Sequence, residues 1–124
     1  MSRRTKAFEK RAGERGVNVE AIAKEKVDAW FTEWQELEGK IHIAHDTRNG
    51  EAKGLMETAI VLFDRLVEEG GDEVLPINGV ERMAFIKAKP GQYACYRQLD
   101  ELFKETKKRT ARLRLQATKT NSNG

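Results

Sequence analysis

Apolar residues recur at helical spacing through residues 18–38 and form the first strong pattern in the chain. At about 100° per residue they fall on one stripe, with Ile22 and Phe31 at its margins. The pattern predicts an amphipathic helix that Asn18 caps at its start and that Gly39 ends in a left-handed conformation. The residues on the stripe are Val19, Ala23, Val27, Trp30, Trp34 and Leu37.

A second helix is predicted over residues 51–69, where Gly70-Gly71 stops it. Asp46 or Asn49 is the expected cap, although Gly50 and Gly54 each weaken a helix by about 1 kcal/mol relative to alanine. Its broad apolar face predicts contact with the first helix and also with a third helix or another subunit. With a linker at residues 39–50, the two helices form an antiparallel hairpin. The face contains Ala52, Leu55, Met56, Ala59, Ile60, Phe63, Leu66 and Val67.

The hydrophobic pattern changes after Gly70-Gly71. Two short apolar runs, residues 74–77 and 80–83, flank Asn78-Gly79, a pair that suits a tight hairpin turn. Pro76 restricts such a ribbon to a sheet edge. The pattern predicts a short β-hairpin or an ordered loop between the second and third helices.

Lys89-Pro90-Gly91 precedes a third predicted helix at residues 92–116. The face of this helix that is expected to pack on the core, its seam, becomes polar toward the end. The last turns should therefore be held less firmly by packing, and residues 118–124 should be disordered. The predicted fold is all-α: an antiparallel helical hairpin plus a long C-terminal helix. We expect a basic N-terminal arm (1–17), a helical core and oligomerisation domain (18–103) and a basic helix end with its tail (104–124). The seam of the third helix is Tyr96, Leu99, Leu102, Phe103, Thr106, Thr110 and Leu113.

The two tryptophans allow two interpretations. One turn apart, they could form a base-stacking platform, but tryptophans on an aliphatic helical stripe favour a core role. We therefore expect a core or oligomer face. Its predicted members are Trp30, Trp34, Leu55, Met56, Ile60, Phe63, Leu66, Leu99 and Phe103.

Charge is segregated along the chain. Residues 1–16 contain six basic and two acidic side chains, residues 104–119 seven and one, and residues 17–103 ten and seventeen. Basic ends on an acidic body predict terminal segments that bind a polyanion, whereas the plainer interpretation is two solvated ends. The candidate DNA-binding residues are Arg3, Arg4, Lys6, Lys10, Arg11, Arg15, Arg97, Lys104, Lys107, Lys108, Arg109, Arg112 and Arg114.

Other chemistry is sparse. The longest apolar run, residues 59–63, is too short to span a bilayer, and no signal-peptide pattern follows the basic start. The lone Cys95 fits a reducing cytoplasm and an inert buried thiol. His42, His45 and Asp46 form the one cluster with ligand-like chemistry, and a solvated linker is favoured over a metal site. We expect a cytoplasmic protein with no enzymatic activity, metal or cofactor.

The order of helix pair, double glycine, Asn78-Gly79, Lys89-Pro90 and a charged, arginine-rich final helix resembles the small subunit of tailed-phage DNA-packaging terminase. The resemblance covers residues 27–115, although a Gly-Leu-Thr-Pro turn frequent in such subunits is missing before the terminal arginines. It implies a non-enzymatic packaging factor that forms a ring in the host cell cytoplasm. That factor would bind viral double-stranded DNA through its basic arms and present it to the large terminase ATPase and nuclease.

Two rival functions remain open from the residues alone. One is a small helical regulator that binds DNA or RNA, with the third helix as the reading element. The other is a helical adaptor or inhibitor whose basic ends only keep it in solution. Subunit number separates packaging from both rivals, and salt-dependent DNA binding separates the adaptor from the other two.

Overall fold

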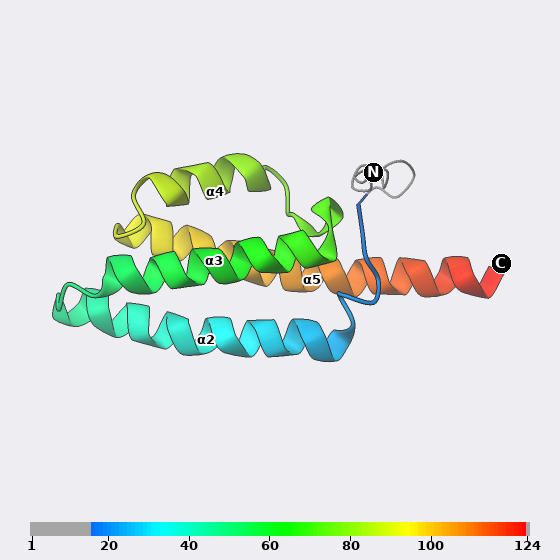
Figure 1. The fold of residues 1–124 in the computed structure, drawn as a ribbon, viewed down its shortest axis with the longest axis horizontal. Helices are drawn as coiled ribbons and strands as arrows, with labels where there is room; N and C mark the ends of the chain where they lie inside the picture. Colours follow the sequence, from blue (N-terminus) through cyan, green and yellow to red (C-terminus); the bar gives the residue numbers. More distant parts are fainter. Residues whose placement is uncertain (1–15, 124) are drawn as a thin grey trace, which may run out of the picture.

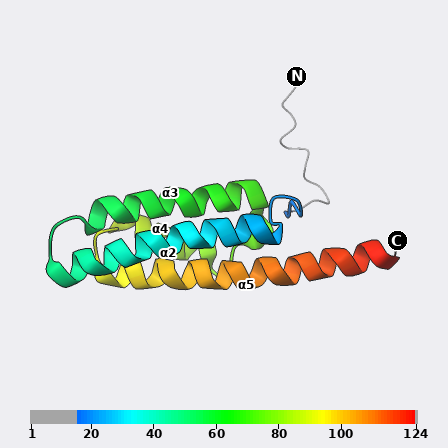
Figure 2. The ribbon, with the colours of Figure 1, turned by 90° about the horizontal axis from the view of Figure 1, so that it is seen from below.

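The computed structural model describes residues 16–123, with side chains to Thr118, and its long elements are helices. They are α2 (Lys24–Thr47), α3 (Ala52–Gly70), α4 (Gly79–Ala88) and α5 (Tyr93–Asn123), with a 3-10 turn, η1, at Asp72–Val74. Successive helices alternate in direction, and α5 extends past the ends of the others (Figures 1 and 2). The predicted all-α class is confirmed.

α2 begins later and ends later than the sequence pattern predicts. Asn18 does not cap α2 itself but caps the turn that precedes α2. In that turn the Asn18 Oδ1 accepts a hydrogen bond from the Ala21 N–H at 3.3 Å. Gly39 does not end the helix, because the buried stripe continues through Ile41 and Ala44 for about two more turns. The left-handed residue that ends α2 is Arg48, at φ 53°. Burial of that extra stripe offsets the roughly 1 kcal/mol helix penalty of one glycine.

The β-hairpin or ordered loop predicted between the second and third helices is wrong, since no strand occurs in residues 16–123 and Gly79–Ala88 form a helix. Asn78 does adopt the left-handed conformation, at φ 57°, but the chain then enters α4. Gly79, Met83 and Ile86 are buried at a spacing of four and three residues, which is the period of a helix. Contact with α5 therefore decides the conformation of a segment whose local signals favour a turn between strands.

α5 runs from Tyr93 to Asn123, close to the predicted start and beyond the predicted end. Its backbone is helical through residues 118–123, where composition predicts disorder. Thr106 and Thr110 are buried on the predicted seam, and Leu113 is partly buried. The side-chain hydroxyl of Thr110 donates to the Lys107 carbonyl at 2.9 Å, so a polar seam position remains satisfied inside the helix.

An aromatic trio joins three helices at the centre of the core. Trp34 of α2 stacks on Phe103 of α5 with ring centroids 4.6 Å apart, and Phe63 of α3 meets Phe103 edge-on at 5.1 Å. The Trp34 Nε1–H donates to Asp100 Oδ1 at 3.1 Å, and Lys104 Nζ lies 2.9 Å from Asp100 Oδ2. These two partners offset the cost of burying the Asp100 carboxylate, which is 5% exposed.

The predicted core or oligomer face lies largely inside this single chain. Trp30 and Leu55 are only partly buried and pack against the core. The wide apolar face of α3 is covered by α2, α5 and η1. The sequence predicts an oligomer from the width of this face, but contacts within one chain are enough to explain that width. Oligomerisation stays a prediction. The buried members are Trp34, Met56, Ile60, Phe63, Leu66, Leu99 and Phe103.

Residues 16–18 run beside the end of α3 and η1. The Glu73 N–H donates to the Gly16 carbonyl at 2.9 Å, and the Asn18 N–H donates to the Gly70 carbonyl at 2.8 Å. Gly71 allows this approach, because its φ is +100° and a Cβ there would lie 2.0 Å from the Gly16 carbonyl oxygen. Gly16, the first described residue, is therefore held next to η1.

Trp34→Ala is expected to lower the free energy of unfolding by about 3–5 kcal/mol. The substitution removes a buried ring, its stack on Phe103 and the hydrogen bond to Asp100. Trp30→Ala should cost less, because that ring is only partly buried. Urea unfolding followed by circular dichroism measures both. Equal losses for the two variants would contradict a central role for the Trp34 contacts.

Candidate functional site

Basic side chains of α5 form an exposed row. Lys104, Lys108 and Arg112 recur every four residues on the side opposite the buried seam, and all three are exposed. We call residues 104–114 of α5 the basic segment. It begins within the bundle and continues toward the end of α5 that extends past the other helices (Figure 2).

Three other cations of the basic segment contact the fold. Arg109 donates to the Glu73 carbonyl and lies 3.3 Å from its carboxylate. Arg114 donates to the Ile22 carbonyl at 2.9 Å, and the Lys107 ammonium lies 4.5 Å from the centroid of the Phe31 ring. These contacts hold the polar end of the α5 seam against the residues before and within α2 and against η1.

In two of those three contacts the positive charge meets a group without net charge, a carbonyl or an aromatic ring, and the nearby carboxylate that it acts on is Asp28. Asp28 responds to the local field. A hydrogen bond from Lys24 is the largest effect and lowers the pKa of the Asp28 carboxyl, burial opposes it, and the charges of Lys24, Lys107 and Arg114 add smaller lowering effects. The basic segment therefore keeps a positive surface despite its internal contacts.

The structure does not gather all of the candidate DNA-binding residues in one place. Arg97 stands over the Tyr96 ring, 5.8 Å from its centroid, seven residues before Lys104 on α5. That separation is about 10 Å along the helix. Six candidates lie outside the described residues: Arg3, Arg4, Lys6, Lys10, Arg11 and Arg15.

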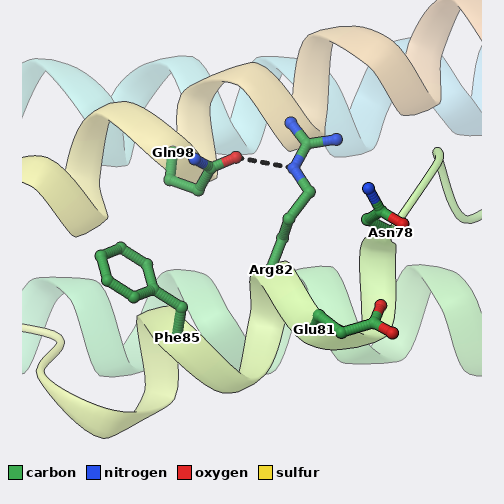
Figure 3. Close-up of a pocket in the computed structure, with 5 residues that line it drawn as sticks. All are labelled: Asn78, Glu81, Arg82, Phe85 and Gln98. Carbon is green, nitrogen blue, oxygen red and sulfur yellow. Dashed lines mark hydrogen bonds between the residues drawn. The ribbon is translucent and has the colours of Figure 1, made fainter.

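A hollow of about 510 Å³ lies between α4 and α5, and we call it the α4 hollow (Figure 3). Its lining residues are Asn78, Glu81, Arg82, Phe85 and Gln98. In Figure 3 the Arg82 side chain reaches from α4 toward α5, while the Glu81 carboxylate points away from Gln98. Phe85 is 52% exposed, and Ile77 and Val80 are two more exposed apolar residues on or just before α4.

Arg82 is the bridge between α4 and α5. It donates to Gln98 Oε1 at 2.7 Å, to the Ile77 carbonyl at 3.1 Å and to both carboxylate oxygens of Glu105 at 2.9 Å. The hydrogen bonds from Arg82 lower the pKa of Glu105 below its ordinary value. The Arg82 charge is therefore used in the bidentate ion pair with Glu105, which holds α4 against α5, rather than in binding a ligand.

A histidine and tyrosine cluster lies where α2 ends and α5 begins. His45 stacks on Tyr96 at 5.7 Å and meets Tyr93 edge-on at 5.3 Å. The Tyr96 hydroxyl donates to Glu38 Oε2 at 2.5 Å. Burial raises the pKa of Tyr96, and the neighbouring Glu38 carboxylate raises it further. These effects favour the neutral form of the Tyr96 hydroxyl, which donates to Glu38.

The histidines lie on α2, not on the linker that the sequence predicts. Within the described residues, no group of three or more His, Cys, Asp or Glu side chains is placed to hold a metal ion. Cys95 is buried, its thiol donates to the Phe85 carbonyl at 3.8 Å, and burial raises its pKa. A protonated buried thiol is a poor nucleophile.

The α4 hollow was missed by sequence reasoning because residues 74–83 were interpreted as strands. The buried positions Gly79, Met83 and Ile86 follow a helical period, and this is the signal that could have found α4. Arg82 and Gln98 lie 16 residues apart in the chain, so nothing local to either residue predicts that they meet.

Residues 24–118 match the family described as YpoC-like protein. The chain belongs to the YpoC-like family. A 33-residue segment is also 61% identical to "Uncharacterized protein YpoC" of Bacillus subtilis (strain 168). That segment covers 27% of this chain and 20% of the Bacillus protein, so the chain spans about a fifth of the length of this relative. No solved structure matches the chain.

The family match overturns the resemblance to a terminase small subunit. It covers residues 24–118 and so includes the whole of residues 27–115, on which that resemblance rests. Amphipathic stripes and helix ends recur in unrelated helical proteins, and they misled the comparison. The packaging role, the ring and the terminase large subunit that the resemblance implies therefore lose their support. No described helix is long and apolar enough to cross a membrane.

A double-mutant cycle on Arg82→Met and Glu105→Gln is expected to give a coupling of about 1 kcal/mol or less, since both groups are partly exposed. The pKa of Glu105 is lowered in the folded protein from an ordinary value of 4.5. The coupling should therefore be complete above about pH 4.5 and disappear as the pH falls through the lowered folded value.

The matched control for this cycle is Lys24 and Asp28, an ion pair at 2.7 Å whose side chains are 74% and 42% exposed. Its coupling should be smaller, because solvent screens it more strongly. Urea unfolding at a series of pH values measures both cycles. A coupling between Arg82 and Glu105 that does not decrease in acid would contradict the assigned ion pair.

Proposed function

We propose that the protein is a non-enzymatic helical protein that binds the phosphate backbone of nucleic acid through the basic segment of α5. The observation that supports this function best is the exposed row of Lys104, Lys108 and Arg112. Lys104 is partly neutralised by Asp100 at 2.9 Å, so Lys108 and Arg112 are the main contacts. Lys107 and Arg114 are turned toward Phe31 and Ile22 instead, and their charges act on Asp28.

The shape of α5 favours binding. A helix that is already formed holds its charges in place, so little side-chain and backbone order is lost when phosphates are contacted. Burial of Thr106 and Thr110 on the opposite side fixes the direction in which Lys108 and Arg112 point. Contacts of this type position a nucleic acid and read little of its sequence. We therefore expect binding that depends strongly on salt and weakly on base sequence.

A helical adaptor is the second candidate function. It is favoured by the exposed apolar side chains on and before α4, where Ile77 is 77%, Val80 69% and Phe85 52% exposed. Exposed apolar residues that cluster on one element mark interaction surfaces more often than scattered ones do. Under this function the positive charges of α5 keep the protein in solution and make no specific contact.

Replacing Lys108 and Arg112 together by glutamine should weaken binding to a short fluorescein-labelled DNA duplex. The logarithm of affinity should fall linearly with the logarithm of salt between about 50 and 200 mM, and the slope should flatten by about two in the double variant. Helix content should change little, because glutamine forms helix about as well as lysine or arginine. Fluorescence anisotropy measures the affinity, with single-stranded RNA as a second probe.

The control is Lys53→Gln with Arg65→Gln on α3, which removes the same charge from exposed positions outside α5. It should leave the salt slope close to that of the parent protein. A further variant, Arg3→Gln with Arg4→Gln, measures the contribution of the N-terminal residues. If the α5 variant and the α3 variant behave alike, the basic segment is not the binding site. If the N-terminal variant also matches the α3 control, the adaptor function replaces nucleic-acid binding.

A further inference from the structure

The α4 hollow brings acidic groups next to exposed apolar side chains. Glu81 lines it, and Glu101 of α5 acts electrostatically on Arg82 at the same place. In the described part of the chain, no cation lies within ion-pair distance of Glu81 or Glu101. Arg82 is neutralised by Glu105. The surface therefore suits a segment that carries both positive charge and an apolar side chain.

Residues 1–15 of this chain have that chemistry. They contain six basic and two acidic side chains, with Phe8 as their aromatic residue. Residues 17–103, to which the α4 hollow largely belongs, contain ten basic and seventeen acidic side chains. Opposite charges on two parts of one chain attract each other without the entropic cost of bringing two molecules together.

The fold holds Gly16, which follows residues 1–15 in the chain, close enough to the α4 hollow for these residues to reach it. Gly16 is hydrogen-bonded to Glu73 of η1, and Asn78 at one end of the hollow follows Glu73 by five residues, at most about 18 Å of chain. Phe85 is about 11 Å further along α4. A segment of 15 residues reaches about 50 Å when extended, and Phe8 alone reaches about 29 Å from Gly16. The hollow is thus within reach of Phe8.

We infer that residues 1–15 dock on the α4 hollow, with Phe8 against Phe85 and with basic side chains beside Glu81 and Glu101. Docking would cover the exposed Phe85 ring from within the same chain. It also gives the segregation of charge an intramolecular role that is separate from the nucleic-acid binding proposed for α5. The two proposals stand on different residues.

Cysteine trapping in the full chain tests the docking. In a Cys95→Ser background, Ala7→Cys is combined with Ala84→Cys, an exposed position on α4. The control pair combines Ala7→Cys with Ile43→Cys, which is 57% exposed on α2 and about 28 Å along that helix from Lys24. Thiol loss under mild oxidation is followed by maleimide labelling and intact mass. Rates are normalised to the reactivity of each single-cysteine variant toward a small disulfide.

The intramolecular disulfide between positions 7 and 84 should form about tenfold faster than the one between positions 7 and 43. Docking raises the local concentration of the first thiol pair. High salt, Glu81→Lys with Glu101→Lys, or Phe8→Ala should each reduce that advantage. Circular dichroism checks that every variant keeps its helix content. Equal closure rates for the two pairs would overturn the docking. Disulfides formed mainly between molecules would instead assign the α4 surface to a second copy of the chain. No nucleic acid is present, so failure of this test leaves the α5 proposal standing.

Discussion

The buried hydrogen bond from Trp34 to Asp100 is the contact on which the rest of the structure depends. A carboxylate in a core must be paired, and Asp100 has its partners on two sides, the indole of α2 and Lys104 of its own helix. Because the indole N–H points in one direction, the bond sets the register of α5 against α2. The stack of Trp34 on Phe103 acts at the next turn and fixes the same register.

Once α5 is held in this register, its other sides are assigned. The seam faces the core, the row of Lys104, Lys108 and Arg112 faces outward, and the flank with Gln98 and Glu105 faces α4. Arg82 then ties α4 to that flank. The basic surface and the α4 hollow are therefore two consequences of one constraint, although they lie on different sides of the same helix.

The arginines of α5 stabilise the fold as well as charging its surface. Arg109 and Arg114 each reach a backbone carbonyl in a segment distant in sequence, and such charge-assisted hydrogen bonds replace the apolar contacts that the polar end of the seam lacks. A count of basic residues cannot reveal this double use, because it depends on which carbonyls lie within reach. Lys108 and Arg112 differ from these arginines in being exposed on the outer row, and that difference makes them the main candidates for nucleic-acid contact.

The sequence by itself determined that the protein is helical, that Trp34 lies in the core and that positive charge collects on α5. These properties follow from periodicity and composition, which are local. It did not determine where α2 ends or that residues 79–88 form a helix. Gly39 locally favours a helix end and Asn78-Gly79 a tight turn, but burial of Ile41, Met83 and Ile86 outweighs both preferences. Nor could it place Arg82 beside Gln98 and Glu105. Only the tertiary structure decided those points, because the free energy of packing depends on contacts between residues far apart in the chain.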